Sequence, residues 1–124
     1  MVASTALWIL FALSIKHFIV DFPLQAFPYQ YKNKGTYMHP GGLLHSGLHG
    51  VGTFVALFFF VQPMAAIGLA TVDAIVHYHI DWAKMNINRI AGWTPVNSEK
   101  FWTLLGLDQL LHTLTYLWIV WILV

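Results

Sequence analysis

The stretch TVDAIVHYHIDWAK, residues 71–84, closes an apolar run and places Asp73, His77 and Asp81 four residues apart. In an α-helix, side chains at positions i and i+4 lie on one face, so these three ionisable groups would form a single stripe. Carboxylates and imidazoles are costly to bury unless they find polar or charged partners. The stretch therefore predicts a helix whose polar face is matched by other polar groups inside the fold.

The composition of the chain is far more apolar than that of an average soluble domain. Of its 124 residues, 58% are hydrophobic and 9% are charged, and none is cysteine. We interpret the chain as one integral membrane domain, residues 1–124, whose first partner is the lipid bilayer. The net charge of +1 at pH 7 excludes the clustered basic surface that nucleic-acid binding needs, so no nucleic acid is expected. Without thiolates, any metal would be held by nitrogen and oxygen.

Four segments approach the roughly 20 apolar residues that a membrane-spanning helix requires. Only Gln62 and Pro63 separate the second and third segments, which makes these two helices antiparallel neighbours. The first segment lacks the basic start of a signal peptide and is expected to be a retained helix. The sequence predicts an all-α integral membrane four-helix bundle with up-down-up-down order, its helices spanning residues 2–22, 43–61, 64–84 and 101–124.

The distribution of charge orients this predicted bundle in the membrane. All charged residues fall within residues 16–34, within residues 73–100, or at Asp108. The two connections at that end carry several lysines and an arginine, which by the positive-inside rule makes this face cytoplasmic. We therefore expect a multi-pass protein of the cell inner (cytoplasmic) membrane with both termini on the non-cytoplasmic side.

Every predicted helix carries ionisable residues at i and i+4. The motifs KHFIVDF, LLHSGLHG and LDQLLHTL add such pairs to the stripe of residues 71–84. Antiparallel order brings the end of the first and third helices level with the start of the second and fourth, so all of these groups should converge in the cytoplasmic half. The predicted site comprises nine residues: His17, Asp21, His45, His49, Asp73, His77, Asp81, Asp108 and His112.

A bound metal explains so many polar groups best. One unpaired Asp at a bilayer centre costs about 2.5 to 3.5 kcal/mol, so several of them need partners, water or a cation. Imidazoles and carboxylates on facing helices form mononuclear and dinuclear metal sites in helical bundles. We therefore expect one or two divalent ions of zinc, iron or manganese as cofactor.

Three further polar residues are expected to lie outside this ligand set. His79 falls on another face of its helix than His77. Lys16 is expected to reach the membrane interface or to pair with an acid. Gln109 is expected to support the site through hydrogen bonds or to bond at the interface.

The motifs KHFIVDFPLQ, LLHSGLHG, VHYHIDWAK and LGLDQLLHTLTY together resemble a family of small bacterial and phage membrane proteins of unknown function, over nearly the whole chain. More remotely, the spacing of His and Asp at the helix ends is similar to that of membrane-bound metal-dependent hydrolases, whose histidine-rich stretch is partly matched by LLHSGLHG. This second resemblance implies a metal-dependent hydrolase.

Three classes of function remain open from the sequence. The first is a membrane metalloenzyme in which a divalent ion activates water and an unliganded Asp acts as base. The second is a proton or ion relay or transport protein, for which residues 1–13 and 54–70 offer little polar lining. The third is a non-catalytic membrane subunit, with a structural polar network or a cofactor such as haem between His77 and His112. Small residues on the second and third helices would also permit a homo-oligomer or a membrane complex partner.

Overall fold

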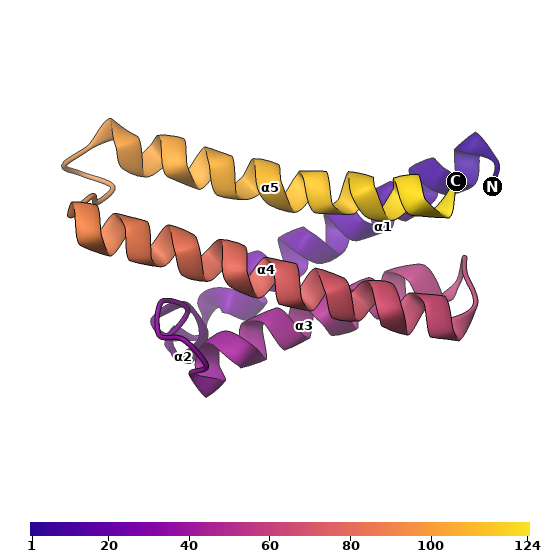
Figure 1. Ribbon diagram of the computed structural model, residues 1–124, viewed down its shortest axis with the longest axis horizontal. Coiled ribbons are helices and arrows are strands. Elements are labelled where there is room, and N and C mark those ends of the chain that lie inside the picture. The colour runs from indigo at the N-terminus through magenta and orange to yellow at the C-terminus, as the bar shows by residue number, and fades with distance from the viewer.

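The computed structural model describes residues 1–124 and is entirely helical (Figure 1). Four long helices form the body of the protein, and a short segment between the first two contains one 3-10 turn and one turn of α-helix. The elements are α1 (Ala3–Asp21), η1 (Leu24–Ala26), α2 (Pro28–Tyr31), α3 (Pro40–Phe58), α4 (Pro63–Ala91) and α5 (Glu99–Leu123).

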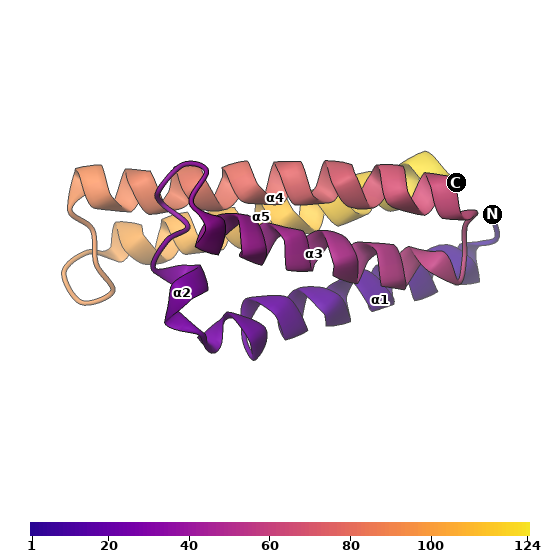
Figure 2. The ribbon, with the colours of Figure 1, turned by 90° about the horizontal axis from the view of Figure 1, so that it is seen from below.

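Successive long helices run in alternating directions (Figures 1 and 2). Around the bundle, α1 packs on α3, α3 on α4, α4 on α5, and α5 back on α1. Both chain termini and the α3–α4 turn lie at one end, which we call the terminal end. The segment with α2 and the α4–α5 connection lie at the other end, which we call the loop end. The antiparallel order predicted from the sequence is thus present.

Local sequence signals define the helix boundaries. Pro40 and Pro63 occupy the first positions of α3 and α4, where a missing N–H costs nothing. α4 ends at Gly92, whose φ of 71° is the left-handed conformation that glycine adopts without strain. No glycine or proline lies between residue 84 and Gly92, so α4 continues to Ala91 and does not end at residue 84 as predicted.

The closest helix packing is between α3 and α4, where small residues meet. A Cβ atom added to Gly50 would lie 3.1 Å from the Cβ of Ala74 and 3.3 Å from the carbonyl oxygen of Ala70. Any larger side chain at position 50 would push the two helices apart. This close approach brings the imidazoles of α3 against those of α4.

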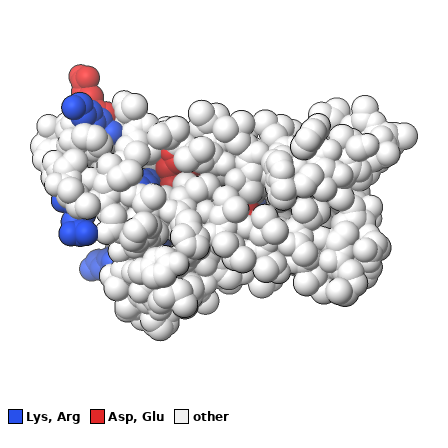
Figure 3. All heavy atoms as spheres, in the orientation of Figure 1, with Lys and Arg blue, Asp and Glu red and all other residues white.

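The bundle has an unusual distribution of polarity. Of 26 buried residues, 13 are polar or charged, whereas long aliphatic and aromatic side chains cover much of the outside. Figure 3 shows Lys and Arg gathered at the loop end, while the terminal end is white on that face. By length and composition, one helical segment, Ala3–Ala26, meets the requirements for crossing a membrane.

The interior itself is divided along the bundle axis. Towards the terminal end, an apolar cluster fills the space between the four helices. Its buried members are Ile9, Leu13, Ala56, Leu57, Ala66, Tyr116 and Ile119. Towards the loop end, the interior contains the carboxylates and imidazoles of the predicted site.

Candidate metal centre

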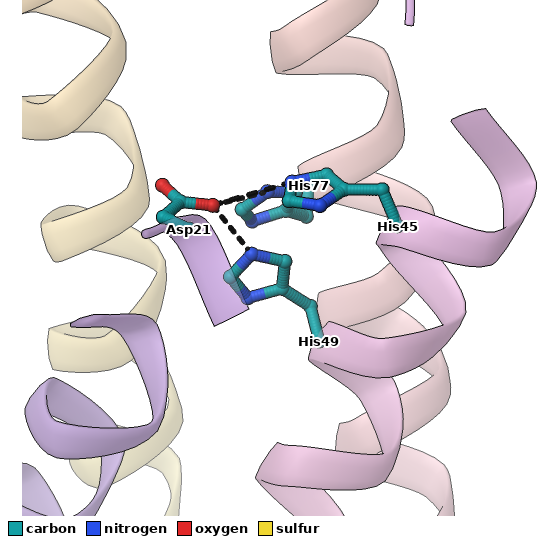
Figure 4. A group of neighbouring side chains, drawn as sticks. All are labelled: Asp21, His45, His49 and His77. Atoms are coloured by element: carbon teal, nitrogen blue, oxygen red, sulfur yellow. Dashed lines mark hydrogen bonds and ion pairs between the residues drawn. The ribbon is translucent and has the colours of Figure 1, made fainter. Parts of the chain in front are cut away.

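The Asp21 carboxylate faces three imidazoles that lie together to one side of it (Figure 4). Its Oδ1 is 2.7 Å from His49 Nε2, 3.2 Å from His45 Nε2 and 3.8 Å from His77 Nε2. One ligand atom from each of the four residues lies within 4.8 Å of all the others. We call Asp21, His45, His49 and His77 the Asp21 group. It joins three helices, α1, α3 and α4, through three nitrogens and one oxygen.

A second set of ligand atoms shares His77 with the first. Asp81 Oδ2 is 3.2 Å from His77 Nε2, and Asp81 Oδ1 is 3.3 Å from His112 Nε2. These three residues also offer atoms within 4.8 Å of one another, and we call them the Asp81 group. The His77 ring stacks on His49 on one side and on His112 on the other, with centroids 3.5 and 3.9 Å apart.

Several buried atoms of the two groups have no hydrogen-bond partner. Neither ring nitrogen of His77 forms a hydrogen bond, and the same holds for His45 Nε2 and Asp81 Oδ2. Three of these atoms have ion-pair contacts instead: Nε2 of both histidines lies 3.2 Å from Asp81 Oδ2, and Lys34 Nζ lies 3.0 Å from the same oxygen. Native proteins leave few buried polar atoms without partners, because each costs about 1 to 3 kcal/mol. Nitrogen and carboxylate oxygen lone pairs facing one another at about 3 Å have the arrangement that a shared cation stabilises.

His17 lies beside the Asp21 group and orients its carboxylate. His17 Nε2 is 3.0 Å from Asp21 Oδ2 and 3.0 Å from Gln109 Oε1, while His17 Nδ1 is 2.7 Å from the Tyr116 hydroxyl. Both ring nitrogens of His17 therefore have protein partners. The structure places His17 behind Asp21, where it holds the carboxylate in position.

Asp108 lies next to the Asp81 group on α5. Gln109 Nε2 donates to its Oδ2 at 3.0 Å, and Lys84 Nζ lies 3.3 Å from the same oxygen. His112 Nε2 lies 3.4 Å from Asp108 Oδ1, an oxygen that has no hydrogen bond. Asp108 is thus close enough to take part in the charge balance of the Asp81 group.

Asp73 belongs to neither the Asp21 group nor the Asp81 group. Its Oδ2 accepts hydrogen bonds from Lys16 Nζ at 2.8 Å and from Thr53 Oγ1 at 2.5 Å. Lys16 Nζ is also 3.0 Å from His49 Nδ1. Lys16 therefore pairs with an acid, which is one of the two roles expected for it. Asp73 is connected to the Asp21 group through this lysine.

Two site residues come from the segment between α1 and α3 and escaped the sequence analysis. Lys34 Nζ lies 3.0 Å from Asp81 Oδ2, and Gln30 Oε1 lies 3.2 Å from His45 Nδ1. Lys34 lies in the connection between α1 and α3, as the charge pattern predicted, but it is only 6% exposed and turns into the bundle. No sequence signal separates it from the exposed Lys32 two residues earlier, because only the folding of the segment against α3 and α4 distinguishes them.

His79 lies apart from both groups. It is exposed, its Nδ1 lies 2.8 Å from the carbonyl oxygen of Ile75, and its Nε2 lies 3.0 Å from the Tyr37 hydroxyl. The helical spacing correctly predicts that His79 is outside the site.

The charges inside the bundle nearly cancel before any ion binds. Four buried or nearly buried carboxylates, those of Asp21, Asp73, Asp81 and Asp108, face the three ammonium groups of Lys16, Lys34 and Lys84. With neutral histidines, four negative and three positive groups leave one net negative charge. Imidazole nitrogens with a carboxylate, and no thiolate, form the ligand set that zinc, iron or manganese takes.

A family model matches residues 9–124, and its description reads "Protein of unknown function (DUF3307)". The chain belongs to this family. The match to DUF3307 covers most of α1, all of the other helices and all nine residues of the predicted site. No curated protein and no solved structure matches the chain.

Proposed function

We propose that this DUF3307 protein is a multi-span membrane protein that binds a divalent metal ion inside its bundle and uses the ion to catalyse hydrolysis. The observation that carries the proposal is the convergence of Asp21 Oδ1 with three histidine nitrogens, all within 4.8 Å and drawn from three helices. Two of these atoms, His45 Nε2 and His77 Nε2, lie 3.2 Å from Asp81 Oδ2 without forming a hydrogen bond to it, which favours a bound cation over a network of hydrogen bonds alone.

The distribution of polarity supports insertion into a membrane. Large apolar side chains such as Phe11 on α1, Val51 on α3, Ile75 on α4 and Leu114 on α5 are each about half exposed. Water would favour the opposite arrangement, because burial of apolar surface is the main driving force for folding in water. In a bilayer, polar side chains turn towards the bundle interior and apolar ones towards lipid, as here.

The location of the exposed cations supports an orientation in the inner membrane. Lys32, Arg89 and Lys100 are exposed and belong to the loop end, where Figure 3 shows the positive charge. By the positive-inside rule we assign this end to the cytoplasm. The metal groups would then lie in the cytoplasmic half, and both termini on the opposite side.

The geometry favours one ion in the Asp21 group, with zinc, iron or manganese as the candidates. Nε2 of His77 faces both groups, and a single lone pair binds only one ion. A second ion would therefore depend on Asp81, His112 and Asp108, with His77 committed to the first. One ion would fill the Asp21 group, and a second ion in the Asp81 group would bring the total to two.

Hydrolysis follows from this arrangement through a general base next to a Lewis acid. A divalent ion held by Asp21, His45, His49 and His77 would act as a Lewis acid on a water molecule bound as a fifth ligand, since these four side chains fill a tetrahedral site. Asp81 Oδ2 lies 3.2 Å from both His45 Nε2 and His77 Nε2, so it would stand beside the ion and could take the proton of the water molecule. Lys34 Nζ, 3.0 Å from the same oxygen, pairs with this carboxylate.

A proton or ion relay is the second candidate. One chain of contacts favours it: Asp73, Lys16, His49 and Asp21 are joined in sequence by distances of 2.8, 3.0 and 2.7 Å. Towards the terminal end the interior is filled by the apolar cluster, which offers no groups to extend this chain of contacts. A complete proton path across the bundle is therefore less favourable. A haem between His77 and His112 does not fit, because these rings are stacked at 3.9 Å and 18°.

The deciding experiment is the metal content of detergent-purified protein, measured by elemental mass spectrometry. We expect one or two equivalents of zinc, iron or manganese in the wild type and a strong loss in His77→Ala, the residue shared by both groups. His79→Ala removes an imidazole from the same helix outside the site and should retain the metal. Equal metal in all three proteins, or none in the wild type, would contradict the proposal and favour the relay.

A further inference from the structure

The four carboxylates inside the bundle differ in their counter-charges. Three of them pair with an ammonium group, in the pairs Asp73–Lys16 at 2.8 Å, Asp81–Lys34 at 3.0 Å and Asp108–Lys84 at 3.3 Å. Asp21 has no such partner, because all of its ion-pair contacts are with imidazoles. With neutral histidines, the single unbalanced negative charge of the interior therefore lies in the Asp21 group.

Lys84 lies between the two carboxylates of the loop end. Its Nζ is 3.3 Å from Asp108 Oδ2 on α5 and 3.9 Å from Asp81 Oδ1 on its own helix. With His112, these are the carboxylates that would have to hold a second ion, since His77 is committed to the first. The ammonium group therefore contacts the same pair of carboxylates that a second metal ion would bridge.

Lys34 supplies another internal cation on the other side of Asp81. Its Nζ is 3.0 Å from Asp81 Oδ2, the oxygen that lies 3.2 Å from both His45 Nε2 and His77 Nε2. The same ammonium group donates a hydrogen bond to Gln25 Oε1 at 2.7 Å. Lys34 is thus held at the Asp81 group by two oxygen partners.

The backbone around Lys34 is fixed by close packing on the start of α3. A Cβ atom added to Gly42 would lie 3.4 Å from Lys34 Cα and 3.2 Å from the carbonyl oxygen of Asn33. A Cβ atom added to Gly41 would overlap the carbonyl oxygen of Tyr29. A larger residue at either position would displace this segment, and with it the ammonium group. The two glycines therefore allow the fold to build Lys34 into the site.

The Asp81 group has no charge left for a metal ion. The carboxylates of Asp81 and Asp108 are balanced by the ammonium groups of Lys34 and Lys84. A divalent ion there would add two uncompensated positive charges to the interior, and buried charge without a partner is costly. In the Asp21 group, the same ion would meet a carboxylate that has no cation.

We infer that the metal centre holds one ion, in the Asp21 group, and that the ammonium groups of Lys34 and Lys84 take the place of a second ion in the Asp81 group. This inference deepens the proposed function and rests on it, because it concerns the number of ions in the same centre. It makes the proposed hydrolysis a one-ion reaction. Two-ion hydrolases place a second metal ion beside the first, whereas here the neighbouring positive charge belongs to the protein's own lysines.

The test is the number of zinc ions per chain, counted by native mass spectrometry of the full chain after loading with zinc in detergent and removal of the excess. We expect one ion in the wild type. Lys84→Met should bind two, because it gives the Asp81 group the negative charge that the Asp21 group already has. Lys84→Arg keeps the charge and should bind one. Lys100→Met, which removes an exposed lysine of the same end, is the matched control and should also bind one.

Two double variants locate the second ion. Lys84→Met with Asp108→Asn restores the charge balance of the Asp81 group and should return to one ion. Lys84→Met with Asp21→Asn should also hold one ion, because only the Asp81 group is then charged. Lys34→Met changes the charge of this group as much as Lys84→Met does and should bind two ions, so it serves as the test if Lys84→Met does not fold.

The outcomes separate this inference from the proposed function. Two ions in the wild type, or one ion in the wild type and in both lysine variants, would overturn the inference and leave metal binding in place. One ion in Lys84→Met and none in the wild type would support the role of the lysine and contradict the Asp21 site. No zinc in any of these proteins would overturn the inference together with the proposed function.

Discussion

The two halves of the bundle are built from the same four helices, but the interior of one half is apolar and that of the other is polar. Towards the terminal end the interior consists of aliphatic and aromatic side chains such as Leu13, Leu57 and Ile119, each fully buried. Towards the loop end it consists of carboxylates, imidazoles and lysines, several with unpaired atoms. The first half is packed as a stable core. The second half buries polar groups at a cost in free energy, which is typical of functional sites.

The difference predicts that substitutions in the two halves change different quantities. A cavity in the apolar half lowers the free energy of unfolding and leaves the ligand atoms in place. Removal of a ligand in the polar half changes metal binding, and removal of one partner of an ion pair changes stability through the charge left behind. Four variants test this separation.

Asp21→Asn should have the largest effect on metal affinity. Asp21 is the only carboxylate within reach of all three imidazoles of its group, and the amide would remove its charge. We expect metal affinity to fall by more than about 100-fold, beyond the range of supporting residues. Competition with a chromophoric chelator measures it, and an affinity within threefold or so of wild type would remove Asp21 from the ligand set.

Lys16→Met should have the largest effect on stability. It leaves the Asp73 carboxylate, whose side chain is 1% exposed, without its cation. Breaking such a pair costs about 3 to 5 kcal/mol, which denaturant titration in detergent can resolve. The double variant Lys16→Met with Asp73→Leu removes both charges and should recover much of the loss. A double variant no more stable than Lys16→Met alone would show that the ion pair is not the cause.

Leu57→Ala tests the apolar half. This side chain is fully buried in the cluster, so we expect a loss of about 2 to 5 kcal/mol from the cavity. Metal stoichiometry should remain that of the wild type. A parallel loss of metal would show that the two halves of the bundle are coupled, contrary to the separation argued above.

Gln109→Leu should have the smallest effect. Its amide bonds both His17 and Asp108, neither of which belongs to the Asp21 group. We expect a decrease in metal affinity of about tenfold, as for other residues that orient ligands. Thr115→Val, which removes a hydroxyl bonded only to a backbone carbonyl of the same helix, is the control. Identical affinities in the two variants would exclude Gln109 from a supporting role.

Much of the fold follows from sequence periodicity. Apolar runs locate the four long helices, and the two-residue turn at Gln62 and Pro63 dictates an antiparallel pair. Because i, i+4 pairs share a face, the convergence of His45 and His49 with His77 was also foreseeable. The end of α4 was not, since residues 85–91 mix polar and apolar side chains beyond the apolar run, and the first stop signal is Gly92.

The rest of the site depends on tertiary contacts that no local pattern encodes. Lys34 and Gln30 reach the core only because the segment after α1 folds back, with η1 against α1 and α2 against α3. The ion pair of Asp73 with Lys16 requires the register between α1 and α4, which the spacing within one helix does not define. Sequence reasoning therefore finds which residues share a helix face, and the structure decides which of their ligand atoms lie within 4.8 Å of one another.

Because α4 is longer than a bilayer is thick, its C-terminal end provides a test of the proposed membrane topology. Its 29 residues rise about 44 Å, whereas the hydrocarbon core of a bilayer is about 30 Å thick. The last turns, including the 77% exposed Ile90, would therefore stand in the cytoplasm. Since the chain has no cysteine, Ile90→Cys creates a single thiol. A membrane-impermeant maleimide should modify it in inverted vesicles and leave it untouched in right-side-out ones.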